Sequence, residues 1–190
     1  MPEDKPASVS PWRTAVLQHR ISVSIALALG CLWFIRPSQE SLLLSLPLIL
    51  LGETVRIWAS GHIHKMVEVT TTGPYALCRH PLYLGHLLVT AGFCVAGNNV
   101  WLAFAVLPLF FAIFIPTMQR EEESLADKFG QTYRDYMAGT TRILPRWSAR
   151  ARQGGHDWQQ VRRHREANNI LGLVAAIAIF AAFGLWRGSW

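Results

Sequence analysis

Apolar residues are gathered into five blocks along the chain, and polar or basic segments separate the blocks. The blocks cover residues 15–35, 42–60, 81–97, 100–118 and 167–186. Each is close to the roughly 20 residues that a helix needs to cross about 30 Å of hydrocarbon. The pattern therefore predicts an all-α protein, a multi-pass membrane helical bundle with about five transmembrane helices.

The second block is the least regular, because Glu53 and Arg56 interrupt it three residues apart on one helical face. Two oppositely charged side chains at this spacing can neutralise each other. An ionisable pair inside a membrane helix can equally line a polar cavity. The sequence leaves both interpretations of this pair open.

Beyond residue 118 the continuously apolar pattern becomes amphipathic. Apolar positions now recur at spacings of seven, four, four and three residues, at Met118, Leu125, Phe129, Tyr133 and Tyr136. This spacing predicts that the fourth helix leaves the bilayer and continues as a cytoplasmic amphipathic helix, which Gly130 interrupts at modest cost. A basic connector over 147–166 and a last transmembrane helix over 167–187 follow. Residues 1–190 are thus predicted to form one membrane domain with its core over 50–146.

Composition and charge support a membrane protein. Hydrophobic residues make up 51% of the chain and charged residues 16%, which excludes an ordinary soluble domain. The net charge of +6 can indicate nucleic-acid binding, but the basic residues follow the predicted topology instead. With a cytoplasmic N-terminus, 16 of the 18 Lys and Arg residues lie inside and only Arg36 and Arg187 lie outside. We expect membrane lipid as a partner and no nucleic acid.

Turn formers, cations and aromatic residues crowd together over residues 72–85, between the second and third blocks. Pro81 suits the first turn of the third helix, which places Arg79 and His80 at its N-terminus. Backbone N–H groups favour anionic groups there, and Arg79 adds donors that can grip a carboxylate or a phosphate. Alternatively, Arg79 and His80 are interfacial anchors of a membrane helix.

The third and fourth helices are predicted to form a hairpin, because a short turn at residues 98–99 without basic residues joins them. The hairpin brings Glu121 and Glu122 back to the level of Arg79 and His80, about forty residues earlier in the chain. Such a site can hold a charged, water-soluble cofactor on one side and a lipid-soluble substrate on the other.

Metal binding and disulfide formation receive little support. His62, His64 and His80 lack the H-E-x-x-H and Cys/His spacings of metal sites, so we expect no metal and solvated or interfacial histidines. The three cysteines show no paired spacing and are predicted to be free thiols.

Two signatures suggest a family. Gly73-Pro74-Tyr75 precedes Arg79-His80-Pro81-Leu82-Tyr83-Leu84-Gly85, and later come Glu121-Glu122, Leu125, Phe129-Gly130, Tyr133, Tyr136, Arg142 and Pro145. In this order and spacing they resemble the isoprenylcysteine carboxyl methyltransferase family and its phospholipid-methylating relatives, in their bacterial form. The resemblance covers roughly residues 50–146. It implies a bacterial inner-membrane enzyme that binds S-adenosyl-L-methionine in a cytoplasm-facing pocket and methylates a lipidic acceptor.

The resemblance also implies roles for individual residues. The residues expected to bind the cofactor are Val69, Thr70, Gly73, Tyr75, His80, Pro81, Tyr83, Gly85 and Glu122. The residues expected to act in catalysis are Arg79, Arg120, Glu121 and Arg142. An arginine would hold an acceptor carboxylate such as that of a prenylcysteine-like substrate, whereas an acceptor amine would need a base, for which Glu121, Glu122 and His80 are candidates.

Two other function classes stay open. Integral-membrane sterol reductases, which use NADPH, are similar around an Arg-His-Pro-x-Tyr-x-Gly stretch such as residues 79–85, although they are much longer. A non-catalytic membrane scaffold or transporter would use the polar cluster only to brace a cytoplasmic mouth, and it would bind neither cofactor.

Overall fold

The computed structural model describes residues 30, 33–64, 67–163 and 166–190. All regular structure in these residues is helical. The α-helices are α2 (Gln39–Ser60), α3 (Pro81–Ala96), α4 (Val100–Phe129), α5 (Gln131–Gly139), α6 (Trp158–Arg163) and α7 (Glu166–Trp186). Two 3-10 turns, η1 (Gly73–Ala76) and η2 (Ala149–Arg152), complete the set. The first predicted crossing, over 15–35, falls mostly outside the described residues.

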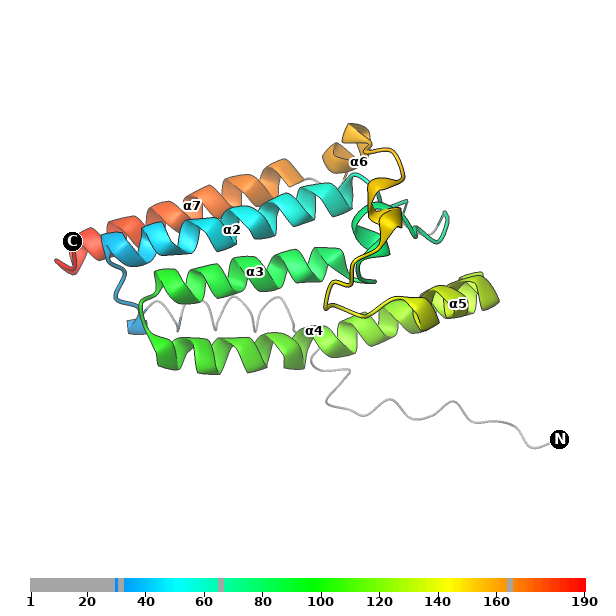
Figure 1. Cartoon of the computed structure of the whole chain (residues 1–190). Coiled ribbons are helices and arrows are strands. Elements are labelled where there is room, and N and C mark those ends of the chain that lie inside the picture. The colour runs from blue at the N-terminus through cyan, green and yellow to red at the C-terminus, as the bar shows by residue number, and fades with distance from the viewer. Residues whose placement is uncertain (1–29, 31–32, 65–66, 164–165) are drawn as a thin grey trace, which may run out of the picture.

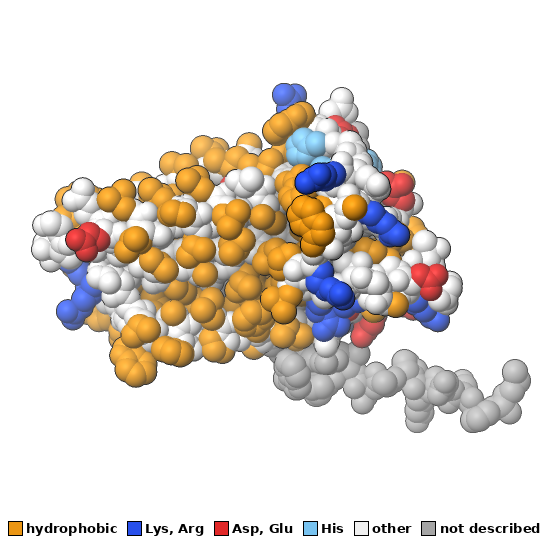
Figure 2. Space-filling view, viewed as in Figure 1, with side chains coloured by type: hydrophobic (Ala, Val, Ile, Leu, Met, Phe, Trp, Pro, Cys, Tyr) orange, Lys and Arg blue, Asp and Glu red, His pale blue; other side chains and the backbone are white. Residues whose placement is uncertain are grey.

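Three of the described helices, α2, α4 and α7, are long and apolar enough to cross a membrane. The apolar helix α3 has 16 residues and is shorter than the other three. Figure 2 shows hydrophobic side chains spread over the length of the bundle and charged side chains gathered at its ends. The prediction of an all-α membrane bundle is therefore confirmed.

The four apolar helices lie in the order α7, α2, α3, α4 (Figure 1). Helices α2 and α3 approach most closely at Gly52 and Gly85, where a Cβ on either glycine would lie 2.7 Å from the carbonyl oxygen of the other. Small residues allow such close approach of helix backbones in membrane bundles. This contact fixes α3, and with it the start of the predicted site, against α2.

The hairpin of α3 and α4 follows the predicted turn. Asn98 takes a positive φ of 48°, and the Asn99 side chain accepts a hydrogen bond from the Trp101 backbone and caps α4. Helix α4 then continues to Phe129, and Gly130, with a φ of 57°, separates it from α5. The amphipathic continuation is thus present, and Gly130 divides it into two helices.

A buried ion cluster joins α2 to α7. The Arg56 Nη1 atom lies 3.4 Å from a Glu53 carboxylate oxygen, and Arg56 Nη2 donates to Glu166 at 2.9 Å. The predicted pair is present, but Arg56 makes its shorter contact with the first residue of α7. The cluster therefore attaches the last helix to the bundle.

The basic connector between α5 and α7 folds back over the loop that precedes α3. The Gly73 N–H donates to Gln153, and the Asp157 N–H donates to the Gly61 carbonyl oxygen. His62 lies below this layer, where it is only 6% exposed and its Nδ1 atom is 2.9 Å from the Trp58 carbonyl oxygen. His62 is therefore buried rather than solvated, because the connector covers it.

Candidate functional site

The site begins at the turn between η1 and α3. Gly73 takes a φ of 58°, which favours glycine, and Pro74 follows it in the first turn of η1. Pro81 is the first residue of α3, as predicted, and His80 is its N-cap. The His80 side chain makes no capping bond to the helix, so its ring is free to face the neighbouring carboxylates.

A distant segment pairs with this turn through its backbone. The Arg79 N–H donates to the Thr141 carbonyl oxygen at 2.8 Å, and the His80 N–H donates to the Arg142 carbonyl oxygen at 3.0 Å. These bonds bring Arg142 beside His80, although the two residues are far apart in sequence. Helix α4 supplies the third side, because the hairpin returns Glu121 to the same end of the bundle.

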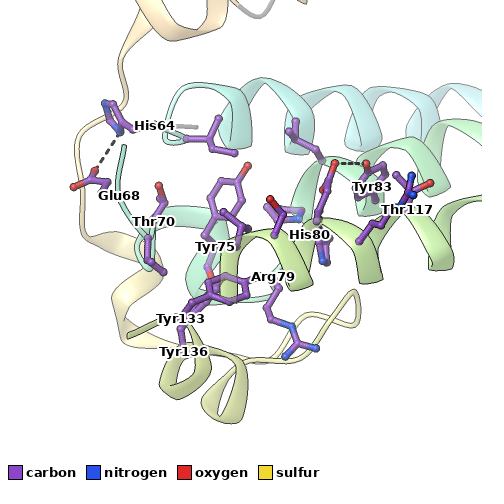
Figure 3. Close-up of a pocket in the computed structure, with 18 of the residues that line it drawn as sticks. His64, Glu68, Thr70, Tyr75, Arg79, His80, Tyr83, Thr117, Tyr133 and Tyr136 are labelled. Atoms are coloured by element: carbon purple, nitrogen blue, oxygen red, sulfur yellow. Dashed lines mark hydrogen bonds and ion pairs between the residues drawn. The ribbon is translucent and has the colours of Figure 1, made fainter. Parts of the chain in front are cut away.

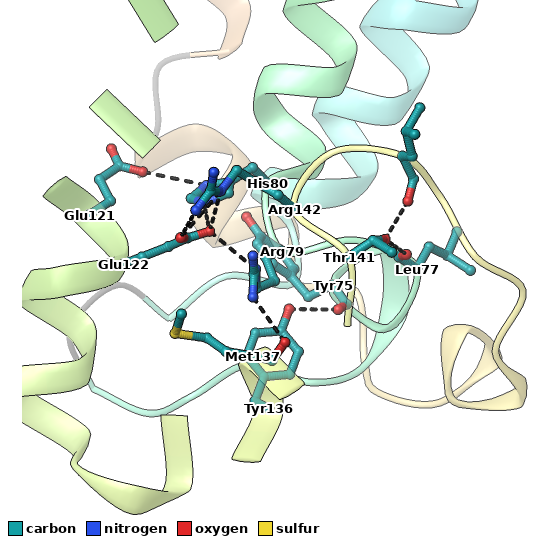
Figure 4. A network of polar contacts seen from close by, with 11 residues as sticks. Tyr75, Leu77, Arg79, His80, Glu121, Glu122, Tyr136, Met137, Thr141 and Arg142 are labelled. Carbon is teal, nitrogen blue, oxygen red and sulfur yellow. Dashed lines mark hydrogen bonds and ion pairs between the residues drawn. The ribbon is translucent and has the colours of Figure 1, made fainter. Parts of the chain in front are cut away.

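The Glu122 carboxylate is the centre of a network of four side chains (Figure 4). Arg142 donates from Nη2 to Oε2 at 2.7 Å and from Nε to Oε1 at 3.0 Å. Arg79 Nε lies 3.1 Å from Oε1, and His80 Nε2 lies 3.1 Å from the same oxygen. Glu122 is 4% exposed, so these partners replace the water that the carboxylate loses.

Both arginines of this network, Arg79 and Arg142, are held in place by its contacts. The hydrogen bonds that Arg142 donates to the Glu122 carboxylate are the main cause that raises the pKa of Arg142, which keeps this guanidinium charged. Arg79 Nη1 also donates to the Met137 carbonyl oxygen at 2.9 Å and so links the network to α5. The network ties α3, α4, α5 and the segment at 141–142 together around one buried carboxylate.

A cavity of about 830 Å³ opens beside this network (Figure 3). Its walls come from residues 63–64 and 68–70, from η1, from the start of α3, from the later part of α4 and from α5. Glu121 lies in the wall with its side chain 51% exposed, and it accepts a hydrogen bond of 2.8 Å from the Tyr83 hydroxyl. Glu121 also lies 3.7 Å from His80 Nδ1, so two adjacent glutamates contact opposite nitrogens of one imidazole.

Aromatic side chains form much of the wall. Tyr75, Tyr133 and Tyr136 gather on one side of the cavity (Figure 3). Burial raises the pKa of Tyr133 to about 12 and that of Tyr75 well above its usual value, so both hydroxyls are neutral. Tyr136 donates to the Tyr75 carbonyl oxygen at 2.7 Å, whereas the buried Tyr75 hydroxyl has no hydrogen-bond partner among the described residues.

The structure brings most of the predicted site residues to this cavity. Nine of them line it, namely Val69, Thr70, Tyr75, Arg79, His80, Pro81, Tyr83, Arg120 and Glu121. Glu122 and Arg142 are not among the lining residues, but Glu122 contacts Arg79 and His80, which are, and Arg142 accepts the backbone hydrogen bond of His80. Gly73 and Gly85 also lie outside the lining, Gly73 in the turn before α3 and Gly85 in the contact with α2.

Several lining residues were missing from the sequence prediction. Thr117 and Ser124 lie four residues before and three residues after Glu121, and His86 lies three residues after Tyr83. Residues at these spacings share a helical face, so periodicity counted from the predicted residues would have found them. His64 and Glu68 also line the cavity, 3.3 Å apart, in a loop without such a signal.

In the part of the chain that the structure describes, no group of three or more His, Cys, Asp or Glu side chains is arranged to hold a metal ion. Cys78 is a buried free thiol, Cys94 is also buried, and Cys31 lies outside the described residues. Burial raises the pKa of Cys78 to about 11, which keeps this thiol protonated and unreactive.

Comparison with known proteins finds two relatives that are named as metal resistance proteins and one that is named as a reductase. The chain is 31% identical to the nickel-cobalt-cadmium resistance protein NccN of Alcaligenes xylosoxydans xylosoxydans, over 75% of this chain and 72% of that protein. It is 34% identical to the cobalt-zinc-cadmium resistance protein CzcN of Cupriavidus metallidurans, over 49% of this chain and 44% of that protein. It is 30% identical to 7-dehydrocholesterol reductase of Danio rerio, over 46% of this chain but 18% of that protein.

No solved structure matches the chain significantly. The sequence profile of the phospholipid methyltransferase family matches residues 25–132, which is more than half of the chain. The matched region contains α2, η1, α3 and all of α4, and therefore includes both halves of the pairing between His80 and Glu122. On this match and the similarity to NccN, the chain belongs to the phospholipid methyltransferase family.

Proposed function

We propose that this protein is an S-adenosyl-L-methionine-dependent methyltransferase that methylates a lipid-soluble acceptor at the cytoplasmic boundary of the membrane. One observation carries the proposal: a cavity of about 830 Å³, lined by tyrosines and titratable side chains, lies at the polar end of an apolar helical bundle. Its volume is within the range of about 300–1,000 Å³ that is typical of small-molecule sites. Membership of the family makes methyl transfer the reaction to expect there.

The groups in the cavity fit the cofactor. The Tyr75 hydroxyl and the Thr70 Oγ1 atom are buried without a hydrogen-bond partner among the described residues, and both residues line the cavity. A buried polar atom without a partner costs stability, so a polar ligand would satisfy both atoms. The tyrosine rings offer π-faces to a sulfonium cation.

When bound, S-adenosyl-L-methionine supplies a methyl group on a positively charged sulfur atom. The protein's own task is then to position the acceptor and to exclude water. Because Arg79 and Arg142 already pair with Glu122, we assign these three residues to holding the site in shape. His80 contacts both glutamates and connects this network to the cavity.

Two residues are left to act on the acceptor. Glu121 is half exposed in the cavity wall and is hydrogen-bonded to Tyr83, so it can accept a proton from an acceptor amine. Arg120, next to it in the wall, can hold an acceptor carboxylate. The proposed acceptor is therefore either a lipid amine, from which Glu121 would take a proton, or a prenylcysteine-like carboxylate, which Arg120 would hold.

Binding of S-adenosyl-L-methionine to the detergent-purified chain, measured by isothermal calorimetry, tests the donor side. Thr70→Val and Tyr75→Phe each remove one partnerless polar atom, so we expect each to weaken binding about two- to tenfold. Thr54→Val is the matched control, because the Thr54 hydroxyl is exposed and bonds only to Leu50 within α2.

S-adenosylhomocysteine and NADPH serve as comparison ligands. The similarity to 7-dehydrocholesterol reductase makes NADPH the specific competitor. Binding of NADPH in place of S-adenosyl-L-methionine would replace the proposal by a reductase function. Binding of neither ligand to folded protein would favour a scaffold. Methyl incorporation into lipid extracts, lost in Glu121→Gln or in Arg120→Gln, would then identify the acceptor class.

A further inference from the structure

A second cavity, of about 620 Å³, lies against the other side of the wall that contains Tyr136. Among the residues that the structure describes, Tyr136 alone lines both cavities. The walls of this second cavity come from residues 71–77, from α5 and from the start of the basic connector. The proposed function makes no use of this space.

The walls of this cavity carry cations and hydroxyl groups. Arg146 and Arg150 line it, and in the part of the chain that the structure describes neither guanidinium forms an ion pair. Asp135 also lines it, but that carboxylate accepts a hydrogen bond of 2.7 Å from Gln131. The hydroxyl groups around the arginines belong to Thr71, Thr132, Thr140 and Ser148. Guanidinium and hydroxyl donors together are the groups that bind a phosphate.

The loop that carries the arginines is fixed in place. The Arg146 N–H donates to the Leu77 carbonyl oxygen at 2.9 Å, only a few residues before the start of α3. The Ser148 hydroxyl accepts a hydrogen bond from the Arg150 N–H at 3.3 Å and begins η2. Both arginines therefore lie on a short segment that these hydrogen bonds hold in place, at the level where the membrane helices end.

Large apolar side chains stand beside this cavity and point away from the protein. Trp147 is 82% exposed and Leu144 is 72% exposed, and the Arg152 guanidinium lies 5.7 Å from the Trp147 ring centroid. Figure 2 shows basic side chains next to hydrophobic ones where the apolar surface of the bundle gives way to its polar end. Tryptophan and arginine together are typical of the membrane–water interface.

We propose that this second cavity binds the phosphate of an anionic membrane lipid. Arg146 and Arg150 contact the phosphate, the hydroxyl groups complete its hydrogen bonds, and Trp147 and Leu144 enter the lipid around it. Attraction to an anionic surface scales with the number of basic residues close to it, at about fivefold in affinity for each. The site is separate from the proposed methyl transfer, and its test does not depend on that function.

Lipid binding is measured by native mass spectrometry of the detergent-purified full chain, with phosphatidylglycerol and phosphatidylcholine as probes. We expect tighter binding of phosphatidylglycerol, and about a 25-fold loss in Arg146→Gln/Arg150→Gln. Lys128→Gln/Arg134→Gln is the matched control, because it removes the same charge from exposed positions at the same end that do not line the cavity. The control is expected to bind phosphatidylglycerol as the original chain does.

Three results would overturn the proposal. Equal losses in the two double variants would show attraction by net charge alone, and displacement of the lipid by millimolar inorganic phosphate would identify a site for the free ion. Trp147→Ser tests the lipid contact without changing the net charge, because it replaces one exposed neutral side chain by another. Undiminished lipid affinity in Trp147→Ser, together with quenching of tryptophan fluorescence by brominated lipid that is the same in this variant as in the original chain, would contradict an interfacial position.

Discussion

Replacing Glu122 by Gln tests whether one carboxylate holds the site together. The substitution keeps the size of the side chain and removes its charge. Arg142 would lose its paired oxygens, and Arg79 and His80 would each lose a charged partner at 3.1 Å. Two positive guanidinium groups would then face each other across a neutral amide.

The magnitude follows from the exposure of each partner. Hydrogen bonds to charged groups contribute about 1.5–3 kcal/mol each, and loss of one member of a buried pair costs about 3–5 kcal/mol. The Arg142 side chain is 37% exposed, so its share is reduced by solvent, whereas the side chains of Arg79 (11%) and His80 (6%) are not well solvated. We expect the free energy of unfolding to fall by about 3 kcal/mol, which lowers the Tm by about 6–12 °C for a chain of this size.

Thermal unfolding in detergent, followed by tryptophan fluorescence, measures this change. Glu123→Gln is the matched control, since Glu123 is the next residue of α4 and is exposed. A double-mutant cycle with Arg142→Gln should show a coupling of about 0.5–3 kcal/mol. An unchanged Tm in Glu122→Gln, a drop equal to that of Glu123→Gln, or additive effects with Arg142→Gln would refute the role of this carboxylate.

Three further experiments test other features of the structure. Gly85→Ala should cost about 1–3 kcal/mol of unfolding free energy by forcing α3 away from α2, whereas Gly172→Ala, with open space around it, should leave the Tm unchanged. Because burial raises the pKa of Cys78 to about 11, its thiol stays protonated at pH 8, and iodoacetamide labelling located by peptide mass spectrometry should be slow until the chain is denatured. Tyr83→Phe removes the 2.8 Å hydrogen bond to the half-exposed Glu121 and should lower methyl transfer with little change in Tm; a large Tm loss would contradict this assignment.

The sequence was sufficient to predict which ends of the helices meet. The turn at 98–99 predicted the hairpin, and a hairpin of two membrane helices returns Glu121 and Glu122 to the level of His80. Pro81 was correctly placed at the start of α3, because its fixed φ and missing N–H suit a first turn. These features depend on local chemistry and on the length of a membrane crossing, and both can be read from one segment at a time.

Contacts between distant segments could not be predicted in the same way. Nothing in the sequence around Glu166 shows that its carboxylate accepts a hydrogen bond from Arg56, 110 residues earlier. The backbone bond from His80 to Arg142 is likewise invisible, since it depends on how α5 turns after Gly130. The family resemblance was sufficient to predict Arg142 as a site residue, but its pairing with Glu122 is evident only in the structure.

That pairing changes what the arginines can do for an acceptor. Before the contacts were known, Arg79, Arg120 and Arg142 were equal candidates to hold a carboxylate. Arg79 and Arg142 could do so only by leaving Glu122, which would strand a buried carboxylate at a cost of several kcal/mol. Arg120 has no contact with Glu122 and already lines the cavity. The cost of breaking the network, rather than the number of nearby cations, therefore makes Arg120 the arginine that an acceptor carboxylate would meet.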